Sequence, residues 1–182
     1  MKKLNILSII CVFILFGCSE DLSDYSEPEG LYVGYSFESR PDEFYIYRGA
    51  NYDVEWTQED SFDGTGSLKI ASDNEEGQIF AYWTLRLYDL PVDKTIKIRV
   101  RVKTKDLNGD GWTISMGTRS QDESIVEFTG LGDKGATDGW EEYGLSLINP
   151  IPEGIDYMDF YLLLLEETSG TVYFDKMEVI AE

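Results

Sequence analysis

The residues near the end of the sequence with the clearest chemical potential are Asp175 and Lys176, because they interrupt a regular alternation of apolar side chains. Val172 and Phe174 share one face of an extended strand, whereas Met177 falls on the opposite parity. A β-bulge at Asp175-Lys176 returns both apolar sets to one core. The bulge also frees a backbone carbonyl and turns a carboxylate sideways, and a hard cation such as calcium binds oxygens of this kind.

The composition removes several classes of function. The sequence contains no histidine, which excludes Ser-His and Cys-His nucleophile pairs, His-ligated zinc and an imidazole base at neutral pH. The net charge of −20 repels phosphate backbones, so we expect no nucleic-acid partner. Chemistry in this chain must therefore depend on carboxylates, hydroxyls, tyrosine, lysine, arginine or a hard metal ion.

The first 17 residues have the form of a signal peptide. Two lysines precede an apolar run from Leu4 to Phe16, which is too short to cross a bilayer as a helix. Leu15-Phe16-Gly17-Cys18 resembles the lipobox of bacterial lipoproteins, in which the cysteine is diacylated; the alternative is cleavage without lipidation, which leaves Cys18 as a free thiol. Ser19-Glu20-Asp21 resembles the acidic export tag of some surface-exposed Gram-negative lipoproteins. We therefore expect an outer-membrane lipoprotein that faces the cell exterior.

The rest of the chain divides into a tether and one domain. Residues 18–30 are polar and acidic and predict a flexible tether. Residues 31–182 have a suitable length for one domain with an ordinary hydrophobic core. We expect this domain to be monomeric.

From residue 31 onward, eleven segments rich in β-branched and aromatic residues alternate with turn clusters. This spacing, without helical periodicity longer than a turn, predicts an antiparallel β-sandwich or barrel. The alternation is clearest in Thr95 to Thr104, where isoleucines and valines face one way and lysines and arginines the other. The predicted strands are 31–38, 43–48, 52–58, 67–71, 79–90, 95–104, 112–119, 124–129, 140–148, 157–166 and 171–180.

Four segments in this order resemble jelly-roll carbohydrate-binding modules of the galactose-binding-like group, especially families 4 and 22. They are Tyr35-Ser36-Phe37-Glu38, the glycine-rich segment 61–70, Gly139-Trp140-Glu141-Glu142-Tyr143 and the closing segment 170–180. The resemblance implies an all-β, antiparallel jelly-roll β-sandwich. It also implies non-catalytic binding of a polysaccharide or oligosaccharide.

The same resemblance implies a structural calcium ion where the first strand, the glycine turn and the last strand meet. By position, Glu38 and Asp175 are the implied carboxylate ligands, and oxygens at Asp63 and Gly66 complete the shell. In the alternative, Glu38 is solvated and Asp175 caps the bulge by accepting backbone N–H bonds. The calcium site is the favoured prediction.

A glycan site needs exposed aromatic rings beside planar polar side chains, because sugars stack their C–H faces on rings and hydrogen-bond through hydroxyls. Tyr82, Arg86 and Tyr88 share the more polar side of the segment 79–90 and meet this need. Ordinary cross-strand packing is the alternative for the tyrosines. The other predicted glycan contacts are Arg99 and Arg101, provided that their strand pairs with 79–90, and Trp112 with Arg119 on the next segment.

The segment 95–105 also carries five basic residues on one side. If this side is concave and open, its arginines favour an anionic or uronic-acid-bearing glycan. The alternative, which we favour, is a solvated strand balanced by acidic neighbours. The five residues are Lys97, Arg99, Arg101, Lys103 and Lys105.

Two functions of other classes stay open beside glycan binding. The same sandwich suits a structural or protein-interaction lipoprotein of an outer-membrane complex. A glycosidase that uses carboxylates alone needs two acids facing each other across a cleft, and no strand signature for such a pair occurs among the 35 acidic residues. We therefore expect no catalytic residue.

Overall fold

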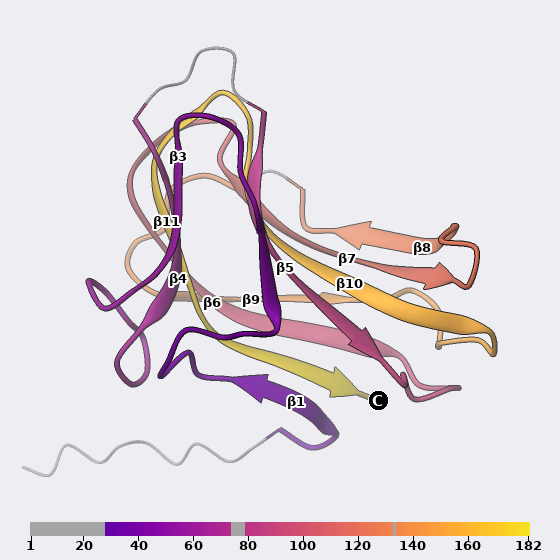
Figure 1. Cartoon of the computed structure of the whole chain (residues 1–182). Coiled ribbons are helices and arrows are strands. Elements are labelled where there is room, and N and C mark those ends of the chain that lie inside the picture. Colours follow the sequence, from indigo (N-terminus) through magenta and orange to yellow (C-terminus); the bar gives the residue numbers. More distant parts are fainter. Residues whose placement is uncertain (1–27, 74–78, 133) are drawn as a thin grey trace, which may run out of the picture.

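The computed structural model describes residues 28–73, 79–132 and 134–182, and in these ranges every regular element is a β-strand. Two antiparallel sheets form the two layers of the domain (Figure 1). The predicted signal peptide, Cys18 and most of the predicted tether lie outside the described residues. Within the described ranges, no helix is long and apolar enough to cross a membrane.

Each of the eleven predicted segments overlaps one strand of the structure, although strands such as Ile96–Gly109 and Thr168–Ala181 extend beyond the predicted ranges. Sheet A has six strands in the order β3-β4-β11-β6-β9, with β1 pairing β11, and sheet B has five in the order β2-β5-β10-β7-β8. The strands of sheet A are β1 (Leu31–Tyr35), β3 (Tyr52–Thr57), β4 (Ser67–Ser72), β6 (Ile96–Gly109), β9 (Glu141–Ser146) and β11 (Thr168–Ala181). The strands of sheet B are β2 (Phe44–Tyr47), β5 (Ala81–Tyr88), β7 (Trp112–Ser120), β8 (Ile125–Gly130) and β10 (Ile155–Leu164).

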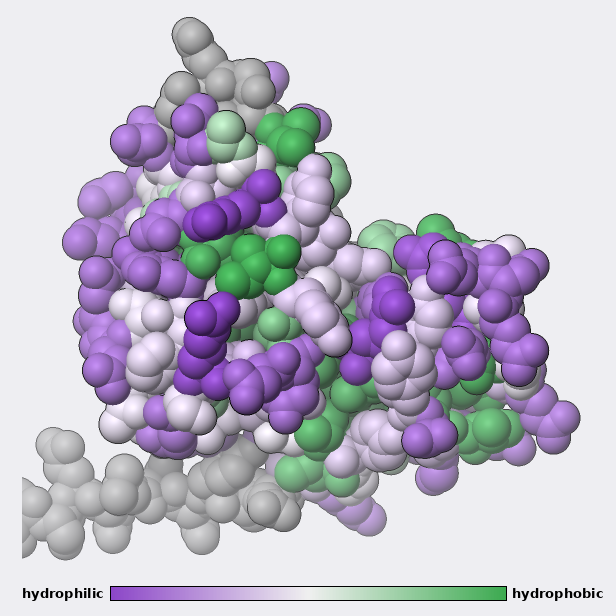
Figure 2. Space-filling view, in the orientation of Figure 1, coloured by the Kyte–Doolittle hydropathy of each residue, from purple (hydrophilic) through white to green (hydrophobic). Residues whose placement is uncertain are grey.

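The core lies between the two sheets and is built by the alternation of each strand. Ile98 and Val100 of β6 and Trp83 and Leu85 of β5 are fully buried, because every second side chain points to the other layer. The opposite side chains of β6 are the basic residues, as the sequence predicts. Outside the core, hydrophilic residues cover most of the face drawn in Figure 2, with separate hydrophobic patches between them.

The predicted bulge in β11 is confirmed. Asp175 pairs with Arg101 of β6 and Glu178 pairs with Arg99, so two residues of β11 lie opposite one of β6. Lys176, the first of the two, has a φ of 45°, in the left-handed region that a bulge can require. The apolar residues on both sides of the bulge consequently reach the same core; Val172, Phe174, Met177 and Val179 are all fully buried.

Candidate functional site

The outer face of sheet B, which points away from the core, carries the tyrosines that the sequence predicts for glycan contact. Tyr82, Arg86 and Tyr88 lie on this face of β5, and 54% of Tyr88 is exposed. The pairing of β2 with β5 brings Tyr47 opposite Tyr82 and Tyr45 opposite Thr84. The Tyr47 and Tyr82 rings stack with centroids 5.0 Å apart. The edge of sheet B next to β2 is therefore an aromatic surface.

A buried carboxylate, Asp159 of β10, lies on the same outer face. Arg86 donates to it twice, from Nε to Oδ1 at 2.7 Å and from Nη2 to Oδ2 at 3.2 Å. The Tyr161 hydroxyl donates to Oδ2 at 3.1 Å, and Arg119 Nε lies 3.9 Å from the same oxygen. Bonding to Asp159 raises the pKa of Arg86. These contacts fix Arg86, which also lies 3.8 Å above the ring of Tyr157.

These side chains surround a hollow of about 500 Å³, which we call the sheet B hollow. Tyr45 and Tyr88, with 65% and 54% of their surfaces exposed, form part of its rim. Rings at the rim and a fixed guanidinium at the floor can stack on a sugar and hydrogen-bond its hydroxyls. The hollow is lined by Glu43, Tyr45, Thr84, Arg86, Tyr88 and Asp159.

The outer face continues beyond Asp159 onto β7 and β8. Gly117 pairs with Asp159 on one side and with Phe128 on the other. A Cβ at Gly117 would lie 2.9 Å from Cδ2 of Phe128, so the glycine allows this ring to lie across the strand. Arg119 follows on β7, where the register places it opposite Tyr157. Tyr82, Arg86, Tyr88 and Arg119 therefore share one face.

The structure does not bring Arg99, Arg101 and Trp112 to this face. The condition for the two arginines was a pairing of segments 79–90 and 95–104, but β5 and β6 belong to different sheets. Trp112 is fully buried in the core, because it shares the parity of Ile114 on β7. These three predicted glycan contacts are therefore wrong for a site on sheet B.

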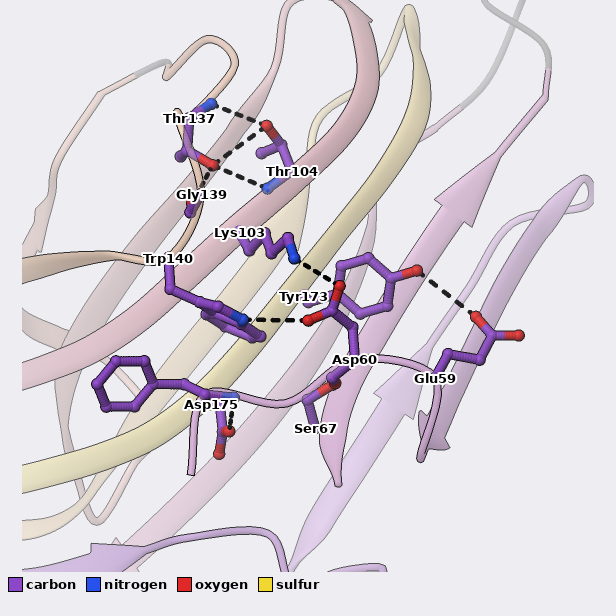
Figure 3. Close-up of polar contacts among 11 residues, drawn as sticks. Glu59, Asp60, Ser67, Lys103, Thr104, Thr137, Gly139, Trp140, Tyr173 and Asp175 are labelled. Carbon is purple, nitrogen blue, oxygen red and sulfur yellow. Dashed lines mark hydrogen bonds and ion pairs between the residues drawn. The ribbon is translucent and has the colours of Figure 1, made fainter. Parts of the chain in front are cut away.

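The basic side of β6 is neutralised by acidic partners on the outer face of sheet A. Arg99 pairs with Glu178 at 2.8 Å and Arg101 with Glu142 at 3.0 Å. Lys103 Nζ lies 2.6 Å from Asp60, which also accepts a bond from the indole of Trp140 (Figure 3). Arg99, Arg101 and Lys103 therefore fit the alternative interpretation, in which acidic neighbours balance the basic charges of the strand.

Asp175 holds the loop 61–66 against the bulge of β11. Its Oδ2 accepts the backbone N–H groups of Phe62 at 2.7 Å and Asp63 at 3.1 Å, and Oδ1 accepts that of Lys176 at 2.6 Å. The side chain is fully buried, and burial raises the pKa of Asp175 to about 6 although the three donors oppose this shift. This arrangement is the bulge cap that the sequence leaves as an alternative to calcium ligation.

The other residues of the predicted calcium site lie around the same loop. The Thr65 hydroxyl donates to both the carbonyl and Oε2 of Glu38, while Asp63 Oδ2 lies 3.3 Å from Lys176 Nζ. Gly66 lies under the indole of Trp56, since a Cβ there would be 2.6 Å from the ring. In the described ranges, no group of three or more acidic side chains could hold a metal ion.

Few oxygen lone pairs at this loop remain available to a cation. Both acceptor sites of Asp175 Oδ2 are used by N–H groups, whereas one site remains on Oδ1. The carboxylate of Glu38 borders the same loop from the other side, close to Gly64. Carboxylates from both ends of the domain thus meet one loop, with a single contact available from Asp175.

Comparison with known proteins supports the fold. No protein-family model and no curated protein matches the sequence. A xylan-binding domain, CBM22-1 of Paenibacillus barcinonensis Xyn10C, has a TM-score of 0.61 at 14% identity and covers 83% of this chain and 94% of that domain. The C-terminal family 22 carbohydrate-binding module of Clostridium thermocellum Xyn10B has a TM-score of 0.60 at 13% identity, with 86% and 97% covered.

The chain has the jelly-roll fold of carbohydrate-binding modules. A third similar structure, the enzymatically active domain of bacteriophage CBA120 tailspike protein 4, has a TM-score of 0.62 at 12% identity, and the match covers 81% of this chain and 20% of that one. The chain thus spans about a fifth of the tailspike domain, whereas it matches the two binding modules over nearly their whole length.

Several residues of this jelly roll's outer face were missed from the sequence. Tyr45 and Tyr47 carry a detectable signal, because they alternate with Phe44 and Ile46 in a short strand. Asp159 interrupts the apolar run of β10, and a charge at such a position indicates a paired or functional side chain. Its two arginine partners come from β5 and β7, and only the strand order brings them together.

Proposed function

We propose that this jelly roll is a non-catalytic glycan-binding module whose ligand lies on the outer face of sheet B. The observation that carries the proposal is the sheet B hollow, where exposed Tyr45 and Tyr88 flank an arginine fixed by a buried aspartate. The rings can stack on the C–H surface of a sugar, and the planar polar groups beside them can hydrogen-bond its hydroxyls. Two carboxylates, Glu43 and Asp159, line the hollow. Asp159 accepts hydrogen bonds from Arg86 and Tyr161, which supports a role in holding Arg86 in place.

Affinity gel electrophoresis on a panel of polysaccharides, including xylan, tests this proposal. We expect retention of the wild-type domain, and a five- to thirtyfold weaker affinity for Tyr45→Ala and Tyr88→Ala, on the basis of about 1–2 kcal/mol for each lost ring contact. Ile148→Ala is the matched control, because the side chain of Ile148 is 81% exposed. Its backbone N–H donates to Glu127 of β8, which places it at the opposite edge of sheet B from β2. Absence of retention on every polysaccharide contradicts the proposal and favours the protein-interaction function.

Calcium at the loop 61–66 is a second part of the proposal. It is supported by the approach of Glu38 and Asp175 to the same loop and by the acceptor site left on Asp175 Oδ1. Thermal unfolding in calcium and in EDTA provides the test. We expect a higher Tm in calcium, since an ion at a hundred times its Kd adds about 2.7 kcal/mol, and a smaller rise for Glu38→Gln. Equal Tm values in both buffers would leave Asp175 as a hydrogen-bonding cap alone.

Display on the outer membrane through a lipid at Cys18 completes the proposal. The support is the lipobox-like sequence 15–18 and the acidic tag that follows it. Weak binding at a single hollow becomes effective when many anchored copies meet one polymer, because each further contact is intramolecular. The mass of the exported protein, compared with that of Cys18→Ser, checks the anchor.

A further inference from the structure

At the sheet B hollow, the buried Asp159 lies between two arginines: Arg86, which also lines the hollow, and Arg119 of β7, which lies next to Asp159 outside the lining. Arg86 forms a two-point contact with Asp159, and Arg119 approaches the same carboxylate at 3.9 Å. The Asp159 side chain is 5% exposed, whereas the Arg86 and Arg119 side chains are 38% and 25% exposed. The buried acid is thus covered by two more accessible cations, so these three side chains together carry one positive charge, which faces the exposed Glu43 of the hollow.

This surplus contrasts with the other ion pairs of the molecule. Arg99, Arg101, Lys103 and Lys176 each pair with an acid of their own, and Lys69 meets three. Among the residues that the structure describes, Asp159 is the one acid with two cationic partners. In a chain with a net charge of −20, this pair of arginines places positively charged donors beside the hollow within a negative surrounding field.

The arginines also keep donors for a ligand. Arg86 uses Nε and one N–H of Nη2 on Asp159 and also interacts with the Tyr88 hydroxyl, and a guanidinium has five N–H donors in a fork that matches a carboxylate. Arg119 uses one Nη1 donor on the carbonyl of Glu123 and also interacts with the Tyr161 hydroxyl. Glu43, which also lines the hollow, opposes an anion, but it is exposed and water and salt screen its charge.

We propose that the sheet B hollow selects glycans that carry carboxylates, such as chains containing uronic acids. This inference rests on the proposed glycan-binding function and names its substrate class. The ligand carboxylate bonds to the free N–H groups of Arg86 and Arg119, while its sugar rings contact Tyr45 and Tyr88. The selective group therefore lies on sheet B, and the paired arginines of β6 take no part.

Titration calorimetry with matched polysaccharides tests the selection. Glucuronoxylan, polygalacturonate and alginate are each compared with their carboxyl-reduced forms, which keep the backbone and replace the carboxylate by a hydroxymethyl group. We expect at least one acidic polymer to bind about tenfold or more tightly than its reduced form, with a preference that shrinks as salt rises. Equal or tighter binding of the reduced forms overturns the inference but keeps the glycan-binding function; no binding to acidic or neutral polymers overturns both.

Two variants locate the selection in the hollow. Arg119→Gln should reduce the preference for the acidic polymer several-fold and leave affinity for the reduced polymer nearly unchanged. Glu43→Gln, at an exposed position where folding is not at risk, should increase affinity for the acidic polymer more than affinity for the reduced polymer. An acidic preference unaffected by both substitutions would place the anion elsewhere and overturn the assignment.

Discussion

Replacing Asp175 by alanine is expected to lower the free energy of unfolding by about 3 kcal/mol, as three backbone N–H groups lose a buried acceptor. Phe62, Asp63 and Lys176 donate these bonds, so the loop 61–66 loses its attachment to β11. Urea unfolding followed by tryptophan fluorescence measures the effect. Asp63→Asn is the control, because the Asp63 side chain is 53% exposed in its ion pair with Lys176 and such pairs contribute little. A loss below 1 kcal/mol for Asp175→Ala would contradict the assigned role.

The pH dependence of the same site follows from the raised pKa. Burial lifts the pKa of Asp175 from 3.8 to about 6, so the folded protein binds this proton more firmly than the unfolded chain. The contribution of Asp175 to stability therefore grows as pH falls from above 6 toward 4. Asp175→Asn keeps one acceptor oxygen and cannot titrate, so the difference between wild type and this variant isolates the effect. A difference that does not change between pH 7.5 and 4.5 would show that Asp175 does not titrate in this range.

Trp112→Ala is expected to cost about 3–5 kcal/mol of stability, as for other large core side chains. The indole is fully buried, meets the ring of Tyr143 edge-on at 4.7 Å and donates to the carbonyl of Gly135 at 3.0 Å. Chemical unfolding of the purified domain measures the loss. Trp112→Phe keeps most of the volume and loses the N–H bond, so it should fold with a smaller penalty of about 1–2 kcal/mol.

The phenylalanine variant also separates the two roles considered for Trp112. A core residue affects stability and leaves glycan affinity unchanged in the folded protein, whereas a ligand contact affects affinity. We therefore expect Trp112→Phe to bind polysaccharide as the wild type does. Normal stability combined with lost binding would return Trp112 to the site.

The fold was predictable because the strands carry clear periodic signals. The switch of parity around Asp175 predicts the bulge, and the alternation from Thr95 to Thr104 predicts the buried side of β6, both of which the structure confirms. The error at Trp112 was avoidable, because Trp112 shares its parity with Ile114 and Met116, while Arg119 falls on the other. The two-residue repeat of side-chain direction along a strand therefore distinguishes the core residue Trp112 from the surface residue Arg119.

The candidate site was less predictable, because it depends on which strands lie side by side. Strands β5 and β6 are consecutive in the sequence, yet the jelly roll places them in opposite layers. Asp159 meets Arg86 across one strand boundary and Arg119 across another, with 73 residues separating the first pair in sequence. Local patterns contain no record of such pairings, since register and strand order arise from the packing of the whole sandwich.

The position of β11 bears on how the chain matures. This strand binds β4, β6 and β1, and partners such as Thr171 and Ala71 are a hundred positions apart. During ribosomal synthesis, β1, β4 and β6 therefore lack their shared partner strand until residues 168–181 have been made. Long-range pairing of this kind is slow, and a nascent polypeptide without residues 168–181 lacks the strand that lies between β4 and β6 in sheet A. We expect sheet A of such a chain to remain incomplete until residues 168–181 have been synthesised.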